Sequence, residues 1–215
     1  MFGASDGLVS NVLLIIGLAG ASASADVVMA AGIAGLLAGA ISMASGEYVS
    51  VRAHNEVVRS ELARERAALE EDPEEEAEEL AELYVERGVE PEQARNIADI
   101  LMRDPDIALE VHAREELGVD PSALASPLGA AGWSFVAFAI GAFVPVVPWF
   151  LAEGSGATWA SVVLGVLGAA SIGTALAVTT GRPVASNVTR HVLIAVAAAG
   201  VTWLIGNALG AAVSL

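Results

Sequence analysis

The sequence contains no cysteine and no lysine. Without cysteine the chain forms no disulfide and offers no thiolate to a metal ion. Without lysine, all ten of its basic residues are arginines. The first six residues also hold no basic side chain, whereas a secretory signal peptide begins with a positively charged segment. We therefore expect the first apolar run to be kept as a helix of the protein.

Charged residues are missing from five long stretches of the chain. Only 17% of the 215 residues are charged, against 55% that are hydrophobic. The uncharged, mostly apolar runs are residues 7–25, 27–46, 121–152, 154–181 and 192–215. Each can hold the helix of about 20 residues that crosses a hydrocarbon layer of about 30 Å. A water-soluble all-α globule would have to bury five helices that are apolar on every face. The sequence therefore predicts an all-α membrane protein with five transmembrane helices.

The arginines predict how the chain is oriented in the membrane. Eight lie between the second and third apolar runs, and Arg182 and Arg190 lie between the fourth and fifth. Because basic residues near span ends are retained in the cytoplasm, both connections are expected there. With five spans, the N-terminus and residues 52–127 then face the cytoplasm and the C-terminus lies outside. The expected membrane is the bacterial plasma membrane.

The long segment between the second and third runs is expected to be a helical domain. The second run continues into a charged amphipathic stretch without glycine or proline after Gly46, which predicts one helix to about Glu71. Three further helices are expected to start at prolines, which suit a first turn: Pro73, Pro91 and Pro105. The predicted parts are residues 1–51 with two spans, this cytoplasmic domain of residues 52–127, and residues 128–215 with three spans. In the third run, Pro145 and Pro148 require neighbouring helices to satisfy the carbonyl groups they free.

Residues 52–127 are strongly acidic. They hold 22 carboxylates and eight arginines, a net charge of −14 out of the −16 of the whole chain. Nucleic acid and anionic lipid are therefore poor partners for this domain, and cations are good ones. Such a charge run can also serve only to keep a domain soluble, and charge alone leaves that interpretation open.

The spacing of some carboxylates favours a metal site. In three glutamate pairs the two members lie one turn apart on the same face of a helix, with Cβ atoms about 5–6 Å apart, where they can share a cation. The pairs are Glu61 with Glu65, Glu78 with Glu82, and Glu76 with Glu79. Like charges so placed destabilise a helix unless they are neutralised. His112 and Glu116 add an imidazole and a carboxylate one turn apart, a combination that suits Fe, Mn, Zn or Co better than Ca or Mg. Alternatively, these last two residues are simply polar side chains at the surface of their helix.

Three residues near the cytoplasmic membrane face are candidates for a transport pathway, since ionisable groups there are usually functional. Asp6 lies at the start of the first run, where it is also placed to cap the helix. Glu47 follows Met43 by one helical turn on the same face, so that a carboxylate and a thioether line one side. Together the three form a candidate cytoplasmic mouth. The alternatives are that Asp6 caps the helix, that Glu47 is a charge at the membrane interface, and that Met43 fills a gap in the packing.

Five stretches carry a resemblance to a known family. They are "SDGLVSN" opening the first run, "AGAISMASGEYVSV" closing the second, the acidic helix from Pro73, "REELGVDP" at residues 114–121, and "VPVVP" in the third run. On these, the chain resembles the vacuolar iron transporter family over essentially its whole length. The resemblance implies a dimer of five-span protomers whose first helices line a central pore. It also implies a cytoplasmic domain that collects Fe²⁺ and related ions, and export of the metal in exchange for protons.

The resemblance also assigns roles to individual residues. Asp6 and Met43 match pore positions, and four glutamates match carboxylate ligands of the metal-binding domain: Glu65, Glu76, Glu79 and Glu116. The chain departs from the family pattern at Gly35, where an intramembrane glutamate is expected, and Glu47 is the candidate substitute. A further ligand position holds Ala68, and a methionine pair is replaced by His112 and Ala113.

The sequence thus predicts a proton-coupled divalent metal transporter, with iron as the first substrate, manganese as the second, and zinc and cobalt as further candidates. The alternative is a membrane protein that does not transport but buffers or senses metal, or docks a basic partner, and Gly35 favours it. No nucleophile with an adjacent base is recognisable, so an enzyme is not expected.

Overall fold

The computed structural model describes residues 2–213, and every regular element in this range is a helix. Five segments are long and apolar enough to cross a membrane. They are α1 (Phe2–Gly20), α2 (Ala25–Glu71), α6 (Pro127–Phe143) with the following 3₁₀ helix η2 (Val144–Phe150), α7 (Gly154–Thr180) and α8 (Val184–Val213). The prediction of an all-α chain with five membrane-length helices is confirmed.

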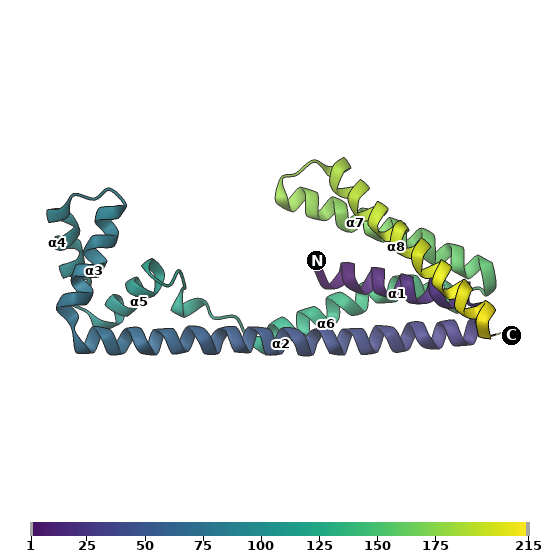
Figure 1. The fold of residues 1–215 in the computed structure, drawn as a ribbon, viewed down its shortest axis with the longest axis horizontal. Helices are drawn as coiled ribbons and strands as arrows, with labels where there is room; N and C mark the ends of the chain where they lie inside the picture. The colour runs from purple at the N-terminus through teal and green to yellow at the C-terminus, as the bar shows by residue number, and fades with distance from the viewer. Residues whose placement is uncertain (1, 214–215) are drawn as a thin grey trace. The chain divides into compact units, whose positions relative to one another are not determined.

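The chain divides into two compact units. The first contains residues 1–48 and 128–215, and the second contains residues 49–127. Helix α2 runs without a break through residues 25–71, so its apolar part belongs to the first unit and its charged part to the second (Figure 1). The cytoplasmic location of the second unit stays a prediction.

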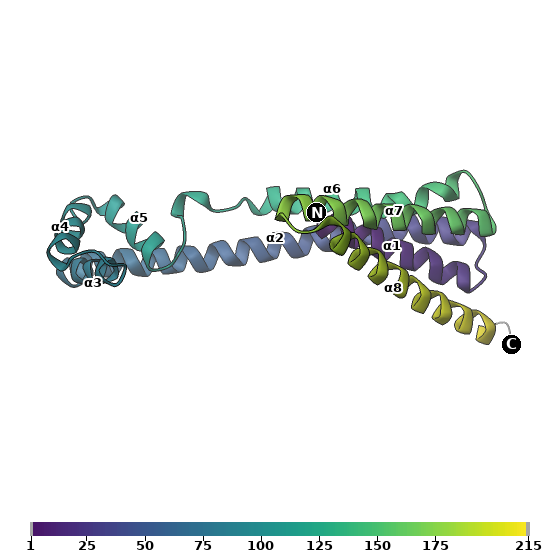
Figure 2. The ribbon, with the colours of Figure 1, turned by 90° about the horizontal axis from the view of Figure 1, so that it is seen from above.

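Helix α1 lies at the centre of the first unit, next to α6, α7 and α8 (Figure 2). Its backbone touches that of α6 at two glycines. A methyl group on Gly7 would overlap the carbonyl oxygen of Phe138, and one on Gly141 would overlap that of Ala4. On α7, small buried residues recur one in every four: Ala157, Ser161, Gly165, Ala169, Gly173 and Ala177. Helix α1 meets this stripe at Gly165, which lies against Val12, whereas Gly173 lies against Val188 of α8. Small residues allow the close helix packing that stabilises proteins in lipid.

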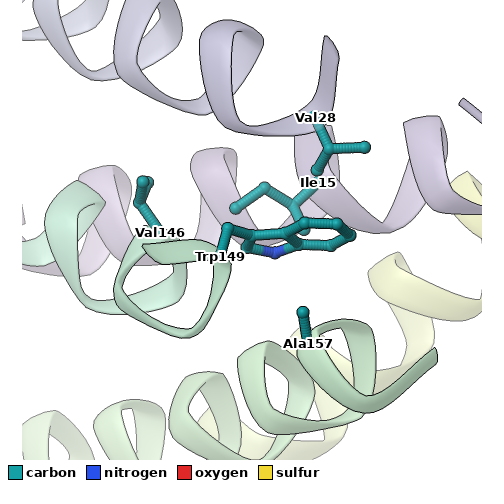
Figure 3. Close-up of a cluster of buried hydrophobic side chains, with 5 residues drawn as sticks. All are labelled: Ile15, Val28, Val146, Trp149 and Ala157. Carbon is teal, nitrogen blue, oxygen red and sulfur yellow. The ribbon is translucent and has the colours of Figure 1, made fainter. Parts of the chain in front are cut away.

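A buried cluster joins α1, α2, η2 and α7 (Figure 3). It contains Ile15, Val28, Val146, Trp149 and Ala157. Beside it, Trp149 Nε1 donates to Ser161 Oγ at 3.0 Å, and Ser161 Oγ donates to the carbonyl of Pro145 at 2.7 Å. In a 3₁₀ helix that carbonyl would accept from residue 148, but Pro148 has no N–H. The expectation that a neighbouring helix satisfies a carbonyl freed by these prolines is therefore confirmed at Pro145.

Three local details differ from the sequence-based expectations. Helix α1 begins at Phe2, so Asp6 lies inside it and does not cap it. No proline precedes Asp6, and the extra turn packs Gly3 against Met43 and Ala137. The third run is not one α-helix, because it changes to 3₁₀ geometry at its prolines. Helix α8 begins directly after Pro183, which includes Arg190 in the helix rather than in the preceding connection.

The second unit combines the charged part of α2 with α3 (Pro73–Glu86), α4 (Pro91–Leu101), α5 (Pro105–Glu115) and the short 3₁₀ helix η1 (Pro121–Ala123). The three expected proline starts are confirmed. Before α3 and α5, the carboxylates of Asp72 and Asp104 accept backbone N–H groups of the first turn. A small core holds α3 and α4 together and consists of Leu80, Ala81, Ala94 and Ala98. The α2 residue Asn55 donates from Nδ2 to the Ala125 carbonyl at 2.8 Å.

We predict that Gly141→Ala destabilises the first unit, because the added methyl group must push α1 and α6 apart. Overpacking of this kind typically costs about 1–3 kcal/mol. Thermal unfolding of the purified protein in detergent measures the effect. Gly132→Ala is the matched control on the same helix, since a methyl group there meets nothing within 4 Å. Equal melting temperatures for the two variants would contradict the close α1–α6 contact.

Candidate metal centre

Four side chains from three helices of the second unit meet at one place. They are Glu65 on α2, Glu76 on α3, His112 on α5 and Glu116, which caps the C-terminus of α5. Each offers a ligand atom, and these atoms all lie within 4.8 Å of one another. The Nδ1 atom of His112 is 2.8 Å from Glu116 Oε1, 3.1 Å from Glu65 Oε1 and 3.6 Å from Glu76 Oε2. Three carboxylates thus surround a single nitrogen.

The local sequence explains how each helix brings its ligand to this place. The break at Asp72–Pro73 ends α2 six residues after Glu65 and turns the chain, so that Glu76 occurs in the first turn of α3. On α5 the buried face contains Ala108 and His112, which are one helical turn apart. Glu116 follows by one more turn and therefore comes next to the imidazole (Figure 1 labels these helices).

The cluster is buried enough to shift the pKa values of two of its carboxyl groups. His112 is fully buried, and the side chains of Glu65 and Glu76 are only 12% and 13% exposed. Burial is the main cause that raises the pKa of the Glu76 carboxyl, and the charges of Glu65 and Glu79 raise it further. Burial also raises the pKa of Glu65, in the charged part of α2, with the charge of Glu116 as the second cause. When they are ionised, the carboxylates repel one another, and burial leaves little water to screen that repulsion.

Two buried atoms of the cluster have no hydrogen-bond partner among the described residues: Glu65 Oε1 and His112 Nε2. Neutral imidazole carries one ring proton. When that proton is on Nδ1, it is donated to the nearest oxygen, which belongs to Glu116. Glu65 Oε1, at 3.1 Å from Nδ1, is the more distant of these two oxygens. Three carboxylates, one of which has an unpartnered oxygen, and one imidazole form a donor set that suits a divalent transition-metal ion.

Two of the expected ligands lie outside the four-residue cluster. Glu79 is exposed on α3, although its charge still raises the pKa of Glu65 and Glu76. Glu61 forms an ion pair with Arg64 at 3.0 Å. Glu65 and Glu76 thus meet in a grouping between helices, and Glu61 and Glu79 are not among its four members. The pair of His112 and Glu116 does meet, at 2.8 Å.

The candidate pathway residues belong to α1 and α2. Asp6 is exposed on α1, and no hydrogen bond or ion pair joins it to Met43 or Glu47 within residues 2–213. Met43 is half-buried, packs against the Phe138 cluster of α6 and touches α1 at Gly3. Glu47 is half-buried, one turn further along α2. The structure therefore brings Met43 to the first turn of α1 and leaves Asp6 facing outward from the single chain.

Sequence reasoning missed a polar residue in the membrane part of α1. Asn11 is only 2% exposed, and its Nδ2 donates to the carbonyls of Gly32 at 3.1 Å and Ala142 at 2.7 Å. It thereby ties α1 to both α2 and α6. Its Oδ1 is buried without a partner and lies where a side chain on Gly35 would begin. The available signal was a lone amide inside the apolar run "SDGLVSNVLLIIG".

Comparison with known proteins gives one consistent result. The sequence model of the VIT family matches residues 1–207. Vacuolar iron transporter 1 of Arabidopsis thaliana is 35% identical over 151 residues, which are 70% of this chain and 60% of that protein. The vacuolar iron transporter of Acanthamoeba castellanii is 42% identical over 68% of this chain and 52% of its own length. That of Centaurea cyanus is 31% identical over 93% of this chain and 82% of its own length. The chain thus spans only part of the first two relatives.

We predict that Glu76→Gln has opposite effects on metal binding and on stability. Loss of a ligand should weaken binding of Mn²⁺, Co²⁺ and Zn²⁺ by at least about tenfold. The metal-free protein should melt at a higher temperature. Because the pKa of Glu76 is raised above its ordinary 4.5 in the folded state, its ionisation at neutral pH costs folding free energy, and glutamine removes that cost.

Isothermal titration and thermal melts of the full chain in detergent measure both quantities. Glu74→Gln is the matched control, because Glu74 is exposed on the same helix and outside the cluster. It should leave the metal affinity unchanged. Equal losses of affinity in the two variants would show that only the overall charge of the domain matters.

Proposed function

Because the chain belongs to the VIT family, we propose that this integral membrane protein transports a divalent metal ion, with Fe²⁺ as the first candidate and Mn²⁺, Zn²⁺ and Co²⁺ as further ones. Relatives that carry the name vacuolar iron transporter support a metal substrate and favour iron. The observation on this chain that carries the proposal is the cluster of Glu65, Glu76, His112 and Glu116, whose ligand atoms lie within 4.8 Å of one another.

In the proposed mechanism the second unit collects the ion at the cytoplasmic face. Its excess of carboxylates raises the local concentration of cations, and the cluster then binds one of them in place of water. A bound divalent ion offsets the mutual repulsion that burial imposes on Glu65 and Glu76. Glu79, whose charge raises the pKa of both Glu65 and Glu76, is proposed to take part as an outer carboxylate.

From there the ion is proposed to enter a pore between two protomers, lined by their first helices, and to leave the cytoplasm. Asp6, Met43 and Glu47 are the proposed pathway residues. The outward-facing position of Asp6 on α1 supports this, because a second copy of α1 would bring a second carboxylate to the same place. Carboxylates that bind the metal when ionised and release it when protonated would couple transport to protons.

The position of the membrane carboxylate is where this chain departs from the family pattern. A Cβ on Gly35 would lie 2.7 Å from Leu14 Cδ2 and 3.0 Å from Asn11 Oδ1, so a glutamate there would have to displace the ends of these two α1 side chains. We therefore propose that Glu47 supplies the carboxylate. The absence of a glutamate at position 35 also favours the second candidate function. In that alternative the membrane protein buffers or senses metal, or docks a basic partner, without transporting.

Metal flux into proteoliposomes tests the proposal. The purified full-length chain should move Fe²⁺, kept reduced without oxygen, and we also predict accelerated flux under an opposing proton gradient. Asp6→Ala should abolish flux while metal still binds to the protein. Asp26→Ala is the control, because Asp26 lies in the first turn at the opposite end of the apolar part of α2.

The outcomes separate the alternatives. Metal binding without any flux by the reconstituted wild-type protein would favour buffering or sensing. Flux that ignores the proton gradient would remove proton coupling but keep transport. Equal loss of flux in Asp6→Ala and Asp26→Ala would remove Asp6 from the pathway.

A further inference from the structure

His112 is the single nitrogen ligand in a cluster that otherwise offers only carboxylate oxygens. We propose that His112, acting through Nδ1, determines which divalent ions the cluster selects. The site should prefer ions that take imidazole readily, such as Fe²⁺, Co²⁺ and Zn²⁺, over Mn²⁺, Mg²⁺ and Ca²⁺, which suit oxygen ligands. The inference rests on the proposed function and concerns the selectivity of its collection site.

Burial fixes the imidazole in place. The His112 side chain is fully buried on the inner face of α5, whereas the side chains of Glu65, Glu76 and Glu116 remain 12%, 13% and 23% exposed. The three carboxylates reach the cluster from three separate backbone positions and can adjust to ions of different size. Since the imidazole alone cannot turn out to solvent, any ion held by all four residues must accept a nitrogen ligand.

Nδ1 is the ring nitrogen of His112 that faces the carboxylates, so it is the nitrogen placed to coordinate an ion. A ring nitrogen binds a metal ion only without its proton. Without an ion, the surrounding carboxylate oxygens favour a proton on Nδ1, and a divalent ion bound among them would replace that proton. Nε2 of His112 has no partner among the described residues, so it is open to carry the ring proton when Nδ1 coordinates.

Pulsed electron paramagnetic resonance of bound Cu²⁺ tests the nitrogen ligand directly. With one equivalent or less of Cu²⁺ on the full-length protein in detergent, the spectrum should show modulation from the remote nitrogen of one imidazole. The modulation should persist in His54→Gln, since His54 is an exposed histidine outside the cluster, and disappear in His112→Gln. A wild-type spectrum without nitrogen modulation would overturn the proposal, and that measurement needs no variant to fold.

Competition titrations test selectivity. His112→Gln should reduce the preference for Zn²⁺ and Co²⁺ over Mn²⁺ by at least about tenfold and change Mn²⁺ binding little. Glu65→Gln should weaken all three ions. If Glu65→Gln does so while His112→Gln leaves the preference unchanged, the selectivity proposal is wrong and the collection site stands. If Glu65→Gln changes no affinity, the collection site itself is wrong.

Discussion

Helices in a lipid bilayer gain little hydrophobic free energy by touching one another. The stability of the first unit therefore depends on how closely α1 packs against its neighbours. Glycine makes that approach possible, because α1 and α6 are in backbone contact at Gly7 and Gly141. Hydrogen bonds then fix the arrangement. Asn11 links α1 to two neighbouring helices, and Ser161 links α7 to the carbonyl of Pro145. With α1 held in this way, Gly3 meets Met43 and Asp6 stays on the outer face.

The second unit is stabilised differently and carries an internal conflict. Its core is small and consists largely of alanine. Beside that core the fold gathers three carboxylates around a buried imidazole, an arrangement that costs folding free energy when the carboxylates are ionised. A fold that maximised its own stability would not place these charges together. A cation resolves the conflict, so the cost of the cluster is itself a reason to interpret it as a binding site.

The sequence predicted the parts of the fold that depend on local chemistry. Proline positions fixed the starts of α3, α4 and α5, and the missing breaker after Gly46 predicted the length of α2. Asp6 was misjudged because a good capping residue does not cap when the helix can extend beyond it. Spacing along one helix identified His112 with Glu116 but did not show that Glu65 and Glu76, on different helices, meet each other and this pair. Their meeting depends on how α2, α3 and α5 pack together, and the residue spacing along a single helix does not predict such packing. Asn11 was missed for the same reason, since its two partners lie on other helices.

Three helices of the second unit begin at an aspartate followed by proline, and each aspartate side chain accepts a backbone N–H of the first turn: Asp72, Asp104 and Asp120. These ends are therefore set by covalent structure and short-range hydrogen bonds, whether or not an ion is bound. Binding then has to order side chains but little backbone, which keeps the entropic cost low. In the language of ligand recognition, the proposed site is pre-organised: its backbone is in place before an ion arrives.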